Sequence, residues 1–325
     1  MRSLIVLLFL LLTAIPAAAE PAFSLPAACE LGRDCFVQNY VDADATEGAR
    51  DFTCGSLTYD QHKGTDIRLR NYIDMERGVD VLAAAPGTVL RLRDGMDDVS
   101  VKEIGLDAVK DRMAGNSVIV DHGDGWVTQY AHMKKGSVAV MPGQKVAAGD
   151  VLGQIGLSGN TEFPHLHFEV RHNDEVVDPF TGGAMGAGCN GNPHALWQAG
   201  GSQNFAYLAT GLLNSGFATV KPEPDAARHG VYAGVALENG SPALVYWVDI
   251  FGLQKGDRLI LELAGPYGRL AESDDVIPRA KALYFAFTGI KQPAEGWDPG
   301  TYKASLHIER EGVIVAESAA EITLP

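Results

Sequence analysis

The sequence has little positive charge. Its 325 residues include 26 Lys and Arg against 41 Asp and Glu, and the formal net charge is −15. Nucleic acids and anionic membrane surfaces are bound by clusters of Lys and Arg, which an acidic chain of this kind does not supply. The composition therefore argues against both of these partners.

Long apolar runs are absent after the first 19 residues. A membrane-spanning helix needs about 20 consecutive apolar residues, and the N-terminal run from Leu4 to Leu12 is shorter and is followed by Pro16. Arg2 before this run and Ala17 to Ala19 after it are typical of a secretory signal peptide with its cleavage site. We therefore predict a signal peptide at 1–19 and an exported protein, periplasmic or secreted, without a membrane span.

Cysteines are few, and the four present form no C-x-x-C pair, which argues against a zinc site built from cysteines. An even number of cysteines in an exported chain is typical of disulfides. Four cysteines allow three connectivities. We favour Cys29–Cys35, which closes a short loop, and Cys54–Cys189, which ties together the two ends of the region between them. A lipid-modified Cys29 is the alternative, but Pro26 stands where a lipidation signal requires Leu.

Helical periodicity is scarce as well. From residue 55 onward, short runs of β-branched and aromatic residues alternate with Gly, Pro and Asp, a pattern typical of antiparallel β-sheets. Residues 99–113 are an exception because their apolar positions approximate helical spacing. We expect a mainly β protein with one inserted helix in its first half.

The length favours two domains, since one domain usually has about 100–200 residues. Regularly spaced short strands near the C-terminus predict a small β-sandwich, for which an immunoglobulin-like fold is one candidate. Trp247, Trp297 and Tyr302 are expected to be core and corner residues of this sandwich rather than a sugar-binding surface. The predicted divisions are a signal peptide at 1–19, a disulfide-linked N-terminal segment at 20–54, a first β domain at 55–181, a Gly-rich linker at 182–215 with a short helix over 204–213, and the sandwich at 216–325.

Two motifs about a hundred residues apart contain metal-binding side chains. The first has His62 and Asp66 four residues apart, with Gly64 between them to allow a tight turn. The second has His165 and His167 in a strand-like run, where the period of two places both side chains on one face. Catalytic zinc takes imidazole and carboxylate ligands, normally three from protein, and leaves one position for water. Three of these four side chains could hold zinc, with the fourth left for proton transfer.

Together with a third motif, these residues resemble the lysostaphin-type zinc metallopeptidases, which cut peptide cross-links in bacterial cell walls. The family pattern is H-x-x-x-D, then H-G-x-G followed by Y-A-H, then a Gly-rich turn before H-x-H. This chain has the elements in that order over roughly residues 55–180, as His62 to Asp66, His122 to His132, Gly156 to Asn160 and His165 to His167.

The resemblance implies that His62, Asp66 and His167 bind zinc. It also implies that His132 and His165 transfer protons and stabilise charge, in an order that the sequence does not indicate. Zinc lowers the pKa of its bound water to about 7, so that a hydroxide can attack the peptide carbonyl. The expected function is a zinc-dependent endopeptidase acting on peptidoglycan cross-links, with a C-terminal domain that could bind a protein partner.

Two alternatives to this function stay open. Relatives that have lost metal ligands act as non-enzymatic activators of other cell-wall hydrolases, but no ligand is missing here. A secreted protease acting on Gly-rich proteins would use the same residues. Nearby, Glu169 either orients a ligand or pairs elsewhere, and Asn116 and Tyr130 are candidates for the groove wall. Asn39 or Asp42 either covers the site or belongs to a structural arm.

Overall fold

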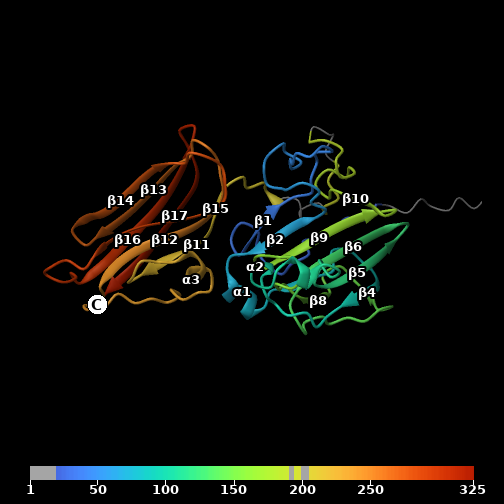
Figure 1. Ribbon diagram of the computed structural model, residues 1–325, viewed down its shortest axis with the longest axis horizontal. Helices are drawn as coiled ribbons and strands as arrows, with labels where there is room; N and C mark the ends of the chain where they lie inside the picture. The colour runs from blue at the N-terminus through green and yellow to red at the C-terminus, as the bar shows by residue number, and fades with distance from the viewer. Residues whose placement is uncertain (1–19, 190–193, 199–204) are drawn as a thin grey trace, which may run out of the picture.

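The computed structural model describes residues 20–189, 194–198 and 205–325, which form two β lobes lying side by side (Figure 1). The predicted signal peptide lies outside the described residues. Among those described, no helix has the length and apolar character needed to cross a membrane. The first lobe holds one large sheet and the second is a sandwich, so the predicted mainly β class is confirmed.

The first lobe is built on an eight-stranded antiparallel sheet with the order β1-β2-β9-β6-β5-β4-β7, in which β10 also pairs with β9. The strands β3 and β8 form a separate pair. These elements are β1 (Cys35–Asn39), β2 (Thr65–Leu69), β3 (Asp80–Leu82), β4 (Gly87–Arg93), β5 (Asn116–Gly123), β6 (Trp126–Met133), β7 (Lys145–Val146), β8 (Val151–Gln154), β9 (His165–His172) and β10 (Glu175–Val177). Because β2, β9 and β6 are neighbours, motifs far apart in sequence meet on one surface.

The side chains of β9 point alternately into the core of this lobe and to the opposite face of the sheet. Leu166 and Phe168 are fully buried, and Phe168 packs against two aromatic rings from outside the sheet. The ring centroids of Phe23 and Trp197 each lie 5.9 Å from that of Phe168. Successive residues of a strand point to opposite faces, so the histidines that alternate with these apolar residues point away from the core.

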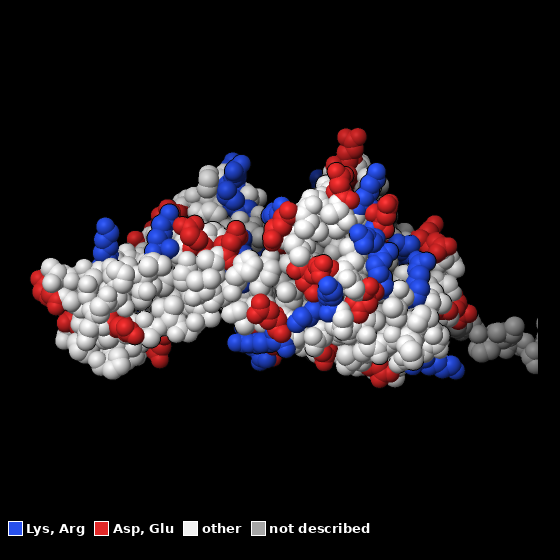
Figure 2. Space-filling view, turned by 60° about the horizontal axis from the view of Figure 1, so that its bottom comes forward, with Lys and Arg blue, Asp and Glu red and all other residues white. Residues whose placement is uncertain are grey.

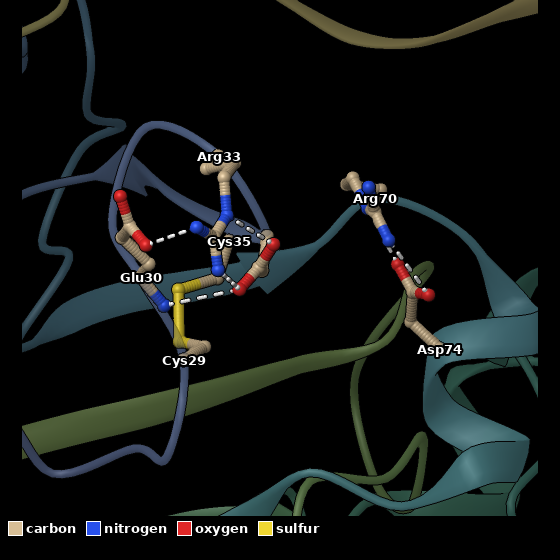
Figure 3. The surroundings of a disulfide bond; sticks show 7 residues. Cys29, Glu30, Arg33, Cys35, Arg70 and Asp74 are labelled. Atoms are coloured by element: carbon tan, nitrogen blue, oxygen red, sulfur yellow. Dashed lines mark hydrogen bonds and ion pairs between the residues drawn. A yellow bond between two sulfur atoms is a disulfide. The ribbon is translucent and has the colours of Figure 1, made fainter.

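Both favoured disulfides, Cys29–Cys35 and Cys54–Cys189, are confirmed. The first ties Cys29 to the first residue of β1, and in the loop between them the charged atoms of Arg33 and Glu30 are 2.5 Å apart (Figure 3). The second joins residues 135 apart in sequence. The strand β1 pairs with β2, so the N-terminal segment is an edge of the main sheet and not a detached arm.

Helices are few and short: α1 (Tyr72–Arg77), α2 (Val101–Ile104), the 3-10 helix η1 (Leu106–Val109) and α3 (Pro224–Arg228). The single inserted helix predicted over residues 99–113 is wrong in its continuity, because α2 and η1 are separate. Gly105 divides them with a φ of 78°, a left-handed conformation that ends a helix.

The short helix predicted over residues 204–213 is also wrong. Its first residue lies outside the described part of the chain, and its end belongs to β11 (Gly211–Ala218). Leu212 packs on the sandwich core, whereas Leu213 joins Phe36 in an apolar cluster between the lobes. Adjacent apolar residues that face two different cores suit a strand, whose side chains alternate. The predicted start of the second domain falls inside β11.

The second lobe is a sandwich of two antiparallel sheets with the orders β11-β12-β15 and β14-β13-β16-β17. Its remaining strands are β12 (Ala243–Leu253), β13 (Arg258–Gly265), β14 (Gly268–Val276), β15 (Lys281–Lys291), β16 (Gly300–Arg310) and β17 (Val313–Leu324). In chain order, the strands of this lobe are paired 1-2-5 and 4-3-6-7. This is an immunoglobulin-like sandwich in which the fourth strand pairs with the third instead of the fifth.

Three aromatic residues have the structural roles predicted for them. The hydroxyl of Tyr302 donates to the backbone oxygen of Asp298 at 2.9 Å, the tyrosine corner of such sandwiches. The indole nitrogen of Trp297 donates to the backbone oxygen of Ser241 at 2.7 Å. Trp247 is buried. None of the three therefore forms an exposed surface for sugars.

The lobes contact each other beside β1 and α1. Phe36 packs with Phe251, and the rings of Tyr72 and His229 stack with centroids 4.0 Å apart. On the face shown in Figure 2, charged residues of both signs crowd over the first lobe, whereas the second lobe is mainly uncharged there. The two lobes thus present different surfaces on either side of their contact.

Candidate metal centre

The strands β2 and β9 bring the two halves of the predicted site together. Asp66 and His167 are paired in register, and His62 lies in the loop before β2. Asp66 Oδ1 is 2.8 Å from His167 Nδ1 and 3.2 Å from His62 Nε2. The two imidazole nitrogens are 3.3 Å apart. The three predicted ligands therefore converge, and together they could hold a metal ion.

The donor set and its spacing fit a tetrahedral zinc ion. At bond lengths of about 2.0–2.1 Å, the ligand atoms around such an ion lie about 3.3 Å apart. The three separations in this site, from 2.8 to 3.3 Å, need only small adjustments to reach that value. Two imidazoles and one carboxylate leave a fourth position for water or substrate.

The N-terminal segment orients His62. The imidazole Nδ1 donates a hydrogen bond to the backbone oxygen of Tyr40 at 2.7 Å, which leaves the lone pair of Nε2 directed at Asp66. Tyr40 directly follows β1. This part of the segment therefore orients a predicted ligand from outside the site.

His167 is confined on two sides. A Cβ atom on Gly64 would lie 2.7 Å from the His167 ring, so the glycine is needed for this close approach and not for the predicted tight turn. On the other side, Glu169 Oε2 lies 3.6 Å from His167 Nε2, an ion-pair distance. Glu169 also pairs with Arg171. Glu169 therefore contacts a predicted ligand and also has a second partner.

His132 on β6 and His165 at the start of β9 form a second pair, with ring centroids 4.7 Å apart. His132 Nδ1 donates to the backbone oxygen of Ser158 at 2.8 Å, and His165 Nδ1 donates to that of Phe163 at 2.9 Å. Each ring therefore directs Nε2 away from these backbone contacts, and His165 Nε2 lies 3.5 Å from Asp66 Oδ1. The φ of His132 is 61°, a left-handed conformation that costs energy in a non-glycine residue and is frequent at functional sites.

Burial and neighbouring charges change the pKa values of the site. Burial raises the pKa of the Asp66 carboxyl, but the three histidines around it outweigh this effect and hold the pKa well below its ordinary value. Burial lowers the pKa of His132 well below its ordinary value, and the adjacent His165 and His167 lower it further. His132 is consequently a neutral imidazole at neutral pH and can accept a proton.

The site opens into a groove with His132 at its middle. A hollow of about 590 Å³ on one side is lined by Asn39, Thr161 and Phe163. A hollow of about 220 Å³ on the other side reaches Glu169. The two hollows share His132, so together they form one depression over the site.

Two predicted groove residues lie elsewhere. Asn116 and Tyr130 are fully buried and bind backbone groups, so their role is structural. Asp42 is likewise buried and accepts hydrogen bonds from backbone N–H groups. Asn39 alone of the N-terminal candidates lines the groove, where it forms part of a wall.

A buried cluster of two histidines and an aspartate, open to a groove and flanked by two further histidines, is the arrangement of a hydrolytic metal site. Residues 60–179 match the model of peptidase family M23, and this part of the chain is a domain of that family. The matched segment contains all five predicted site residues. The lysostaphin-type resemblance predicted from the motifs is confirmed.

Relatives match this domain over short stretches. The cell division protein DipM of Caulobacter vibrioides is 45% identical over 64 residues, 20% of this chain and 10% of that protein. The peptidoglycan DD-endopeptidase ShyA of Vibrio cholerae is 42% identical over 57 residues, 18% of this chain and 13% of that protein. The chain thus spans a small part of these relatives. A zinc-containing peptidase from Vibrio cholerae aligns with a TM-score of 0.33 at 22% identity, covering 49% of this chain and 39% of its own.

Proposed function

We propose that the protein is a zinc-dependent endopeptidase that hydrolyses peptide cross-links of bacterial peptidoglycan in the periplasm or outside the cell. The observation that carries the proposal is the convergence of His62, Asp66 and His167 at the spacing of a tetrahedral zinc site. The name of ShyA, a peptidoglycan endopeptidase, supports the choice of substrate. The two disulfides suit an exported protein.

A bound zinc would supply a Lewis acid that polarises the peptide carbonyl and acidifies the attacking water. We assign proton acceptance to His132, because its imidazole is neutral and its Nδ1 is already committed to a backbone oxygen. His165 is the group that, once protonated, stabilises the charge developing on the carbonyl oxygen. Its anchoring to Phe163 keeps the ring in place for this role.

The test is digestion of purified peptidoglycan by the zinc-loaded mature protein, followed by mass analysis of the fragments. We expect new amino and carboxyl termini at one type of cross-link, and none with His167→Ala. Casein and elastin serve as comparison substrates. Cleavage of elastin but not of peptidoglycan would favour a protease of Gly-rich proteins instead. No cleavage of either, together with stimulation of other wall hydrolases, would favour an activator.

We also propose that the chemistry belongs to the first domain and that the sandwich positions it on the wall or on a protein partner. All five site residues precede β11. A chain ending at Ala209 should keep zinc and cleave small soluble cross-linked peptides, but it should work less well on intact sacculi. Equal loss on both substrates by a folded, metal-bound protein would mean that the sandwich helps to form the groove.

A further inference from the structure

Arg68 is a buried cation without a carboxylate partner. It lies on β2 with 2% of its surface exposed, and its Nε has no hydrogen-bond partner. Its Nη1 donates to the side-chain oxygen of Gln38, which is a neutral group. Within the described part of the chain, no carboxylate forms an ion pair with it. Arginine stays protonated, and buried charges are normally paired, so this guanidinium lacks its usual compensation.

The arginines around Arg68 have partners. Arg70 binds Asp74 at 2.8 Å on the edge of the first lobe (Figure 3). Arg228 of the second lobe binds Asp249 through two hydrogen bonds of 2.7 and 2.9 Å. Asp74 and Asp249 are thus already engaged by other arginines, and Arg68 remains as a buried cation that an added anion could satisfy.

Arg68 lies beside the proposed catalytic histidines. It is two residues from Asp66 on the same face of β2, and it pairs in register with His165. The ring centroid of His165 lies 4.7 Å from that of His132 and 4.8 Å from that of Phe163. The guanidinium carbon of Arg68 is 4.4 Å from the Phe163 centroid. A continuous stack of side chains therefore leads from the site to this cation.

A hollow of about 190 Å³ between the lobes contains Arg68 in its wall. Phe163 also lines the larger hollow over the catalytic histidines, as do Lys102 and Glu162, whose charged atoms are 2.6 Å apart. The two hollows therefore adjoin. The far wall of the smaller one is formed by α3 of the second lobe, and Glu103, an acidic residue on its rim, is exposed to water.

We propose that the hollow around Arg68 is a carboxylate-binding subsite of the peptide groove, in which the guanidinium binds a free carboxylate of the substrate. This inference rests on the proposed peptidase function. Two residues along β2 correspond to about 7 Å, which is about two residues of an extended peptide. The carboxylate should therefore lie within about two residues of the bond that is cut, whether it ends the peptide or belongs to a side chain.

Binding of short acetylated D-peptides to the zinc-loaded mature protein tests the subsite. The probes are N-acetyl-D-alanyl-D-alanine, its carboxamide, and N-acetyl-D-alanyl-D-glutamate blocked as the main-chain amide, each titrated calorimetrically. A charge-assisted hydrogen bond should favour a carboxylate over the carboxamide by about 10- to 100-fold. The stronger of the two carboxylate probes identifies its source. Equal affinity for all three probes would overturn the proposal.

Arg68→Met removes the charge while keeping an unbranched side chain on the Phe163 ring. The variant should bind all three probes equally weakly, because buried charges can be replaced by apolar groups without loss of folding. The matched control is Arg279→Gln, an exposed arginine of the second lobe, which should keep the preference. A preference that persists in folded, zinc-containing Arg68→Met would assign the carboxylate to another group. If that variant does not fold, Arg68→Lys should show a reduced preference.

The binding experiment requires no hydrolysis, so its outcome is separate from that of the peptidoglycan digestion. If the protein prefers the carboxylate probes but leaves peptidoglycan intact, the subsite is supported and the proposed substrate is contradicted. If the protein cuts cross-links but binds the carboxylate and carboxamide probes equally, the proposed function is supported and the subsite is contradicted.

Discussion

Two buried aspartates of the sandwich and Asp66 of the first lobe have different kinds of partner. In the sandwich, Asp249 binds Arg228 and Asp257 binds Arg310, each through two hydrogen bonds of 2.7 to 2.9 Å. In the first lobe, the buried Asp66 has three histidines around it and no ion pair with a lysine or arginine in the described structure. Arginine carries a permanent charge, whereas a neutral imidazole can give its lone pair to a metal.

The buried aspartates of the sandwich thus have a structural role, whereas the surroundings of Asp66 suit the binding of a cation. A bidentate arginine–carboxylate pair is complete in itself and has no need of a further partner. The three-histidine environment is electrostatically complete only when the imidazoles are protonated or when a cation lies among them. The contrast can be tested by making the same change in both lobes.

The largest effect is expected when an aspartate loses its charge. Asp66→Asn should abolish zinc binding and turnover, because one anionic ligand is gone. Asp249→Asn should keep zinc but lower the free energy of unfolding by about 3 kcal/mol, at the lower end for a broken buried pair because Arg228 is partly exposed. Metal analysis and denaturant unfolding of both variants measure the two effects.

The comparison would fail if both variants behaved alike. Zinc retained in Asp66→Asn with unchanged stoichiometry would remove this residue from the ligand set. Zinc lost from a folded Asp249→Asn would mean that the sandwich supports the metal centre through the contact between the lobes.

A smaller loss is expected for the two histidines proposed to act on the substrate. His132→Ala and His165→Ala should keep zinc but lower kcat by about 10²- to 10⁴-fold, the usual cost of removing a general acid or base. His307→Ala, which changes a histidine of the sandwich, is the control and should retain full turnover. Complete loss of metal in either of the first two variants would make that residue a ligand.

The five site residues could be predicted because they belong to short motifs whose residue spacing can be read directly from the sequence. It could not predict what holds them, since the oxygens of Tyr40 and Ser158 belong to the backbone and carry no residue signature. The tight approach of His167 to Gly64 was also missed, because it depends on a strand about a hundred residues away. Local residue spacing thus indicates which side chains form the site, whereas contacts between distant parts of the chain determine how those side chains are oriented.

Prediction of the fold failed in one place for a local reason and in another for a tertiary one. Residues 99–113 have helical spacing, but Gly105 ends the helix after one turn. Residues 204–213 were expected to include a short helix, but Leu212 and Leu213 face two different cores, as adjacent residues of a strand do. The unpaired state of Arg68 was likewise invisible, because a sequence does not show which charges find a partner.

The smallest predicted effect concerns a second buried carboxylate of the first lobe. Burial, with a smaller contribution from the neighbouring Asp51, raises the pKa of Asp178 to about 6. Its oxygens accept hydrogen bonds from the N–H of Phe180 and the hydroxyl of Thr181. Unlike Asp249, this group pairs with no arginine among the described residues, so its ionised form destabilises the folded protein.

The sign of the pH effect follows from that raised pKa. Between an unfolded pKa of 3.8 and a folded pKa of about 6, the folded protein holds a proton that the unfolded chain releases, so stability falls as the pH rises through this window. Asp178→Asn should remove this dependence and raise the free energy of unfolding at pH 8 by about 2–3 kcal/mol. Urea unfolding of both proteins at pH 4 and pH 8 measures it, and the two should differ little at pH 4. A variant destabilised at pH 8 would show that the ionised carboxylate is compensated after all, and that the two lobes do not differ at this residue.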